Sequence, residues 1–312
     1  RRRGLDISPD RLVLTSSTSE AYSLLFRLLA DPGDSVLAPA PAYPLFDLLA
    51  RINDVALVSY PLSVDLDFAI DREALMRAAG PRTKAVIVVN PGNPSGAFLK
   101  RPEMESLVEI CGPRGLPLIS DEVFGDFAAG DAHDRVVTVA GDKRLLCFAL
   151  NGLSKMLALP QLKLAWIAVS GSEPQVEEAL SRLEVLTDTY LSVGTPVQLA
   201  LPELLALRPA IQRSLQDRLD ANRRRLERLA AASRGSRCLP AEGGWSAVLS
   251  VPRARGEEDL ALTLLEEDGV LVHPGYFFDF PKEGHLVVSL LPPAEVFTPA
   301  IERLLARLDA ES

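Results

Sequence analysis

The sequence predicts an α/β fold: a mostly parallel sheet sandwiched by helices, followed by a smaller C-terminal α/β domain. Three observations support this prediction. The chain has 312 residues, which is enough for one large and one smaller domain. Short apolar runs alternate with amphipathic helical patterns, an order that is typical of a parallel sheet. After about Leu205 the composition changes, and a long Arg-rich segment begins.

The predicted strands of the first domain are short apolar runs, namely Val36–Ala38, Val55–Tyr60, Ala85–Asn90, Leu116–Ser120, Leu145–Leu150 and Leu164–Ser170. Between several of them lie amphipathic patterns that predict helices at Glu20–Ala30, Pro102–Cys111 and Glu173–Leu186. In such sheets ligands bind beyond the carboxyl ends of the strands. We therefore expect the chemistry in the loops that follow them.

The second domain is predicted to begin with a solvated connecting helix at Pro209–Ser233. Further strands are predicted at Ala247–Val251, Val270–His273 and Leu286–Leu291, and helices at Glu257–Asp268 and Ala294–Ala310. We place the large domain at residues 1–205 and the small domain, with the connecting helix, at residues 206–312.

Bulk properties exclude several classes of function. The net charge of −9 argues against a surface for nucleic acid or anionic membranes, and no apolar stretch is long enough to span a bilayer. The cysteines Cys111, Cys147 and Cys238 share no metal-ligand spacing, and the three histidines suggest no metal site. We expect a cytoplasmic protein. Because the chain starts with Arg1, we also expect an N-terminal segment to precede it.

One lysine stands out from the others. Lys155 follows the predicted strand Leu145–Leu150 and a short loop, and it runs into the apolar residues Met156–Leu159. A lysine among apolar neighbours is desolvated, which lowers its pKa and makes the amine a usable nucleophile. From this context alone, a structural lysine that extends its amine to solvent is at least as plausible.

Several motifs follow the predicted strands, namely Pro39–Phe46 (PAPAYPLF), Asn90–Gly96 (NPGNPSG), Asp121–Phe124 (DEVF) and Ser154–Lys155. Five pieces resemble class I/II aminotransferases in order and spacing, namely Thr15–Ala21 (TSSTSEA), NPGNPSG, Ser120–Phe124 (SDEVF), Leu153–Lys155 (LSK) and Gly269–Gly275 (GVLVHPG). These aminotransferases are pyridoxal-phosphate enzymes of fold type I. The resemblance extends from Leu12 to the C-terminal helix, and its five pieces in order are far more specific than any one of them.

The resemblance implies pyridoxal 5′-phosphate as cofactor and two catalytic residues. Lys155 would hold the cofactor as a Schiff base and then move the proton during transamination. Asp121 would stabilise the protonated pyridine nitrogen, which lets the ring act as an electron sink. Its neighbour Glu122 is interpreted as structural.

The remaining predicted cofactor-binding residues surround the ring and the phosphate, namely Thr18, Ser19, Tyr43, Asn93, Phe124, Ser154 and Lys163. Thr18 and Ser19 are expected at a helix N-terminus beside the phosphate. Tyr43 would stack on the ring, and Asn93 would bind its phenolic oxygen.

Three positions depart from the family pattern. Lys163 stands where an Arg usually binds the phosphate, Gly152 replaces a frequent Ser, and Phe124 replaces a Tyr that donates to the phenolic oxygen. The first two departures predict a weaker grip on the phosphate, because Lys lacks the bidentate fork of Arg.

The resemblance implies transfer of an amino group from an amino acid to a keto acid in ping-pong fashion, by a homodimer. Two alternatives stay open. One is a pyridoxal-phosphate lyase or decarboxylase, because the fold does not decide which bond at Cα breaks. The other is an aminotransferase-like, ligand-sensing domain of a transcription regulator.

The strand near the C-terminus departs from the family most strongly. Family members carry there an Arg that binds the substrate α-carboxylate, and the matching position is Val287, within His285–Ser289. No Arg lies between Arg255 and Arg303. We expect an amino-acid substrate whose carboxylate is bound by a cation from elsewhere in the fold or from a partner subunit. A substrate without a free α-carboxylate is the alternative.

Overall fold

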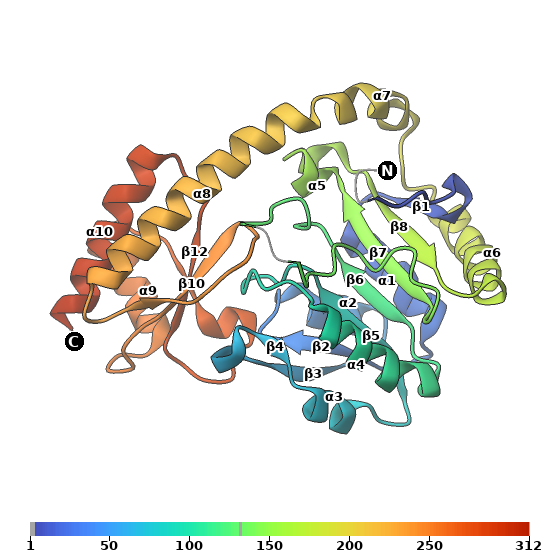
Figure 1. Ribbon diagram of the computed structural model, residues 1–312, viewed down its shortest axis with the longest axis horizontal. Helices are drawn as coiled ribbons and strands as arrows, with labels where there is room; N and C mark the ends of the chain where they lie inside the picture. Colours follow the sequence, from blue (N-terminus) through green and yellow to red (C-terminus); the bar gives the residue numbers. More distant parts are fainter. Residues whose placement is uncertain (1–3, 131–132, 312) are drawn as a thin grey trace.

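The computed structural model describes residues 4–130 and 133–311, and its centre is an eight-stranded sheet (Figure 1). In the order of the sheet, its strands are β1 (Leu12–Thr15), β8 (Ala165–Ser170), β7 (Cys147–Gly152), β6 (Leu118–Asp121), β5 (Thr83–Val89), β2 (Ser35–Ala40), β3 (Ala56–Ser63) and β4 (Ala69–Ile70). The five strands from β7 to β3 are mutually parallel, whereas β1, β8 and β4 pair antiparallel with their neighbours. The predicted mostly parallel sheet is confirmed.

Helices cover both faces of this sheet. One face packs against α1 (Thr18–Leu29), α2 (Leu45–Ile52) and α6 (Glu173–Tyr190), and the other against α3 (Arg72–Ala78) and α4 (Arg101–Cys111). Consecutive strand residues therefore point into different cores: Ile87 lies in the first and Val88 in the second, and both are buried. This explains why the strands read as continuous apolar runs.

A second unit follows α7 (Thr195–Ala206). It begins with the long helix α8 (Arg208–Ala232), which runs from α7 to the far end of the molecule (Figure 1). Its four-stranded antiparallel sheet has the order β11 (His273–Pro274), β12 (His285–Ser289), β10 (Ser246–Ser250), β9 (Arg237–Cys238). The helices α8, α9 (Glu257–Glu266) and α10 (Ala294–Ala310) share an apolar core with one face of this sheet. The predicted division of the chain after residue 205 falls at the end of α7 and stays a prediction.

The strand predicted at Val270–His273 is wrong for most of its length. Val270 and Val272 are buried and Leu271 is exposed, which produces the alternation of a strand. The Val270 amide, however, donates to the carbonyl of Leu264 in α9 at 2.8 Å, so this stretch ends a helix. Only His273 and Pro274 pair with β12. The elements β1, α2, α3 and α7 were not predicted, because their apolar runs are brief or irregular.

Candidate active site

A cavity of about 390 Å³ lies beyond the carboxyl ends of β5, β6 and β7. Every residue that the sequence placed in the cofactor site lines it, namely Thr18, Ser19, Tyr43, Asn93, Asp121, Phe124, Ser154, Lys155 and Lys163. They come from parts of the chain that are up to 145 residues apart (163 − 18). Because neighbouring parallel strands end at the same edge of the sheet, the loops that follow them meet in this cavity.

Lys155 lies in the short helix α5 (Leu153–Met156), directly after β7. Its side chain is half-buried, and Nζ lies 5.5 Å from the ring centre of Phe124 and 5.2 Å from that of Trp245. Burial lowers the pKa of the Lys155 amine, and the negative charge of Asp121 opposes this shift. The neutral amine, which is the nucleophilic form, is therefore favoured relative to a lysine in water.

Asp121 ends β6 as a buried carboxyl group. The hydroxyl of Tyr22 donates to Oδ2 and the amide of Val123 donates to Oδ1, each at 3.2 Å. Burial raises the pKa of Asp121 to about 6, whereas these two hydrogen bonds lower it. A carboxylate in this environment gains strongly from a positive group placed beside it.

Helix α1 begins at Thr18, so Thr18 and Ser19 are its first two residues. The start predicted near Glu20 is therefore two residues too late. Ser17 is the actual N-cap, because its hydroxyl accepts from the amide of Glu20 at 3.1 Å. The cavity therefore receives the positive end of a helix of 12 residues. Lys163 lines the same cavity, and its backbone is left-handed with φ 51°.

Gly152 has a structural reason for replacing Ser. A Cβ atom at this position would lie 2.8 Å from Cβ and 2.9 Å from Cα of Ala165 on the neighbouring antiparallel strand. Real Cβ atoms do not approach so closely, so the close pairing of β7 with β8 leaves no room for a serine.

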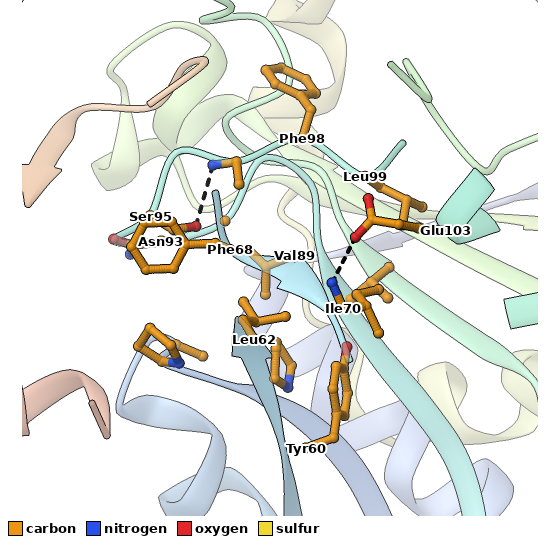
Figure 2. Close-up of a pocket in the computed structure, with 16 residues that line it drawn as sticks. Tyr60, Leu62, Phe68, Ile70, Val89, Asn93, Ser95, Phe98, Leu99 and Glu103 are labelled. Atoms are coloured by element: carbon orange, nitrogen blue, oxygen red, sulfur yellow. Dashed lines mark hydrogen bonds between the residues drawn. The ribbon is translucent and has the colours of Figure 1, made fainter. Parts of the chain in front are cut away.

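The remaining predicted residues line the walls of the cavity. The Tyr43 side chain is exposed, and Phe124 is buried with its ring 5.5 Å from that of Trp245 in an edge-on arrangement. Asn93 also lines a smaller, largely apolar pocket with Phe68 and Phe98 (Figure 2).

The sequence did not point to Ser17, Tyr22 or the contact of Trp245 with Lys155. Tyr22 follows Thr18 by four residues and so shares its helix face, a signal that could have been used. Trp245 packs against the C-terminal core, and its ring also lies beside Lys155.

Val287 is buried, and it packs in an apolar cluster with Phe68, Phe278 and Phe280. It pairs with Val248 of β10. Among the described residues that line the cavity, the cationic side chains are those of Lys155 and Lys163. The source of a cation for the substrate carboxylate stays a prediction.

Within residues 4–130 and 133–311, no helix is long and apolar enough to cross a membrane. The same residues contain no group of three or more His, Cys, Asp or Glu side chains arranged to hold a metal ion.

The cavity fits the predicted cofactor, because each polar part of pyridoxal phosphate has a matching group. The phosphate matches the N-terminus of α1 and Lys163, and the pyridine nitrogen matches the buried carboxylate of Asp121. The phenolic oxygen matches the amide of Asn93, and the aldehyde matches the amine of Lys155.

Comparisons with known proteins agree with this chemistry. The family model described as "Aminotransferase class I and II" matches residues 1–304. The chain is 28% identical over 310 residues to an alanine aminotransferase of Mycobacterium tuberculosis (strain H37Rv), covering 95% of this chain and 70% of the relative. It is 26% identical over 298 residues to the glutamate-pyruvate aminotransferase AlaA of Escherichia coli (strain K12), covering 93% and 73%.

Solved structures show the same similarity. An alanine aminotransferase from Pyrococcus furiosus superposes with a TM-score of 0.89 at 25% identity, covering 98% of this chain and 78% of that one. A tyrosine aminotransferase from Leishmania infantum, at 22% identity, shares the fold with a TM-score of 0.89. The chain therefore belongs to the class I and II aminotransferases and is a pyridoxal-phosphate-dependent aminotransferase.

Proposed function

We propose that this enzyme moves an amino group from an amino acid to a keto acid in ping-pong fashion, with Lys155 as the residue that binds the cofactor covalently. The observation that carries the proposal is a half-buried amine with a lowered pKa in the same cavity as the buried carboxylate of Asp121. When bound, pyridoxal phosphate supplies an aldehyde for the amino group and an electron sink for the bond that breaks at Cα.

The residues of this chain would divide the remaining work. Lys155 would act as the neutral amine that takes the proton from Cα of the donor and later gives it back. Asp121 would keep the pyridine nitrogen protonated. Thr18, Ser19, Ser154 and Lys163 would bind the phosphate, and Tyr43 would stack on the ring. Asn93 would donate to the phenolic oxygen, and Phe124 would pack beside it without donating.

The names of the relatives suggest which substrates to test first. They mention alanine, glutamate and pyruvate, so we propose glutamate as donor with pyruvate as acceptor, and the reverse reaction with alanine. The experiment is a panel of single donors, added to the holoenzyme without an acceptor while the absorbance of the bound cofactor is followed. A donor of the enzyme converts the cofactor to its amino form, and a keto acid then restores the original spectrum.

The same experiment separates transamination from the alternatives. A lyase or decarboxylase releases its product without needing a keto acid, whereas a transaminase stops after one half-reaction. The relatives described above are named aminotransferases, which favours transfer over elimination and over a purely ligand-sensing domain.

We also propose that the enzyme is a homodimer and works in the cytoplasm. Helix α7 has no buried side chain, and Leu199 within it and Leu191 before it are more than 70% exposed. An apolar patch of this kind typically marks a protein interface. The three cysteines are free, which fits a reducing compartment. Sedimentation of the holoenzyme tests the assembly state.

Phe124→Tyr should lower the pH at which the absorbance of the bound cofactor changes. A hydroxyl near the phenolic oxygen of the cofactor stabilises its negative charge, which accompanies loss of the proton from the neighbouring nitrogen. Phe124 lines the cavity with Asn93, so the new hydroxyl would add a second donor there. A spectrophotometric titration of both proteins measures the shift. An unchanged or higher value would show that residue 124 does not face that oxygen.

Val287→Arg should destabilise the protein and should not improve a standard donor. The new cation would enter the apolar cluster of Phe68, Phe278 and Phe280, where an unpaired buried charge costs about 3 kcal/mol or more. Urea denaturation measures the loss of stability, and donor kinetics measure specificity. Val287→Leu is the matched control. Tighter binding of alanine or aspartate with normal turnover would contradict the expectation of a displaced carboxylate anchor.

A further inference from the structure

Three segments of backbone meet at Glu242, just before β10 begins. They are residues 242–244, the loop around Gly96, and residues 127–129. The Glu242 amide donates to the Gly96 carbonyl at 3.1 Å, and its own carbonyl accepts from the Ala129 amide at 2.7 Å. The Gly244 amide donates to the Phe127 carbonyl at 3.0 Å. Gly96 lies in the loop that carries Asn93, and Phe127 lies in the loop that carries Phe124. The entry to the small sheet is therefore tied to two walls of the active-site cavity.

The three segments are packed as closely as backbones allow. A Cβ atom at Gly96 would lie 2.5 Å from the carbonyl oxygen of Gly243, and one at Gly243 would lie 2.5 Å from that of Phe127. Neither position tolerates a side chain unless the backbone moves. A shift of any one segment is therefore transmitted to the others.

The Glu242 carboxylate binds residues of the large unit next to these three segments. Oε2 accepts from the Phe98 amide at 3.0 Å, while Oε1 contacts the Lys100 ammonium and lies 3.4 Å from Nη2 of Arg135. The Arg135 guanidinium lies over the Phe98 ring, 4.9 Å from its centre. The Arg135 side chain is only 11% exposed and that of Glu242 28%, so solvent screens these charges less than it screens a surface pair.

Trp245 stands three residues beyond this carboxylate, and its ring lies 5.2 Å from Nζ of Lys155. The ring also packs edge-on against Phe124 and Phe127. Among the described residues, none accepts a hydrogen bond from its buried Nε1. The position of the ring is therefore set by packing and by the backbone that leads to it.

We propose that Glu242 is a positioning residue for transamination: it clamps the entry of the small sheet against the loops of Asn93 and Phe124, and so holds Trp245 beside the Lys155 amine. The proposal rests on the proposed function of Lys155. A wall of Trp245 and Phe124 keeps water from the amine and restricts its directions, and small misplacements of a reacting group are costly.

The first test reads the position of Trp245 in the protein without cofactor. The chain has two tryptophans, so a Trp166→Phe background leaves Trp245 as the single reporter. In that background Glu242→Ala should shift the emission to longer wavelength and increase quenching by acrylamide. Glu242→Gln should give a smaller change, because its amide oxygen can still accept from Phe98. Glu105→Gln is the matched control, since Glu105 pairs with Arg144 on the exposed surface of α4, and should match the parent.

The second test reads the reaction of the holoenzyme. Glu242→Ala should lower kcat by about 10- to 100-fold, the range expected for a misplaced reacting group, while KM changes little. Fluorescence identical to the parent, or altered fluorescence with the kcat of the parent, would overturn the proposal. If Glu242→Ala does not fold, Glu242→Gln decides by the same two measurements. Failure of the proposed function would show differently, as a cofactor bound to a lysine other than Lys155.

Discussion

Lys155→Ala should abolish transamination while the protein keeps its fold. The variant lacks both the amine that binds the cofactor and the base that moves the proton, so we expect a loss of at least about 10⁴-fold in kcat, the upper range for a general acid–base. The fold should persist, because burial disfavours the charged amine, and Asp121, whose charge interacts with it, keeps its hydrogen bonds from Tyr22 and Val123. Circular dichroism and urea denaturation check the fold, and the donor panel checks activity.

Chemical labelling locates the covalent bond independently of activity. Borohydride reduction of the native holoenzyme followed by peptide mapping should place the pyridoxyl label on Lys155. Lys163→Ala is the control: Lys163 lines the same cavity at its phosphate end, so this variant should bind the cofactor more weakly and still carry the label on Lys155. A label on Lys163 in the native enzyme would contradict the assignment.

The site residues that could be predicted from the sequence are those at the carboxyl ends of the parallel strands. Asn93 and Lys155 follow β5 and β7, and Asp121 ends β6, which lies between these two strands in the sheet. Their motifs are local in sequence, and the rule that ligands bind at the carboxyl ends of strands brings them together without knowledge of side-chain packing. The same rule accounts for the agreement between the predicted cofactor residues and the lining of the cavity.

The parts that could not be predicted depend on contacts between distant segments. Trp245 lies 90 residues from Lys155 in the sequence (245 − 155), and it reaches the amine only because the small sheet packs against the large unit. Val287 could be recognised as a missing Arg, but its apolar neighbours Phe68, Phe278 and Phe280 come from two segments that are far apart in the sequence. In the stretch TSST, several residues could cap the helix, and the sequence alone did not single out Ser17.

Asp121→Asn should lower kcat by roughly 10²–10³-fold, the cost of removing one preorganised electrostatic partner from an active site. The amide keeps the size of the side chain but cannot stabilise a protonated pyridine nitrogen by charge. Turnover of the best donor measures the loss, and absorbance titration with cofactor measures binding. Glu122→Gln is a poor control, because Glu122 accepts from Ser120 and from Val139 within the core. Glu105→Gln, on the exposed surface of α4, is the better choice.

Asp121→Asn should raise the stability of the protein without cofactor at pH 7, although it lowers kcat. Burial raises the pKa of Asp121 from an ordinary 3.8 to about 6, so the folded state favours the protonated carboxyl group. Its contribution to stability is therefore complete below about pH 4 and is lost as pH rises through about 6, a change of about 3 kcal/mol. Asp121→Asn removes this pH dependence and so should raise the free energy of unfolding at pH 7. The amide can accept only one of the hydrogen bonds from Tyr22 and Val123, and the loss of the other offsets about 1 kcal/mol of that increase. Urea denaturation between pH 4.5 and 7.5 should show a falling free energy of unfolding for the native chain and a flatter one for the variant. If activity and stability at pH 7 fell together instead, Asp121 would be a structural strand-end acid, and its proposed catalytic function would be wrong.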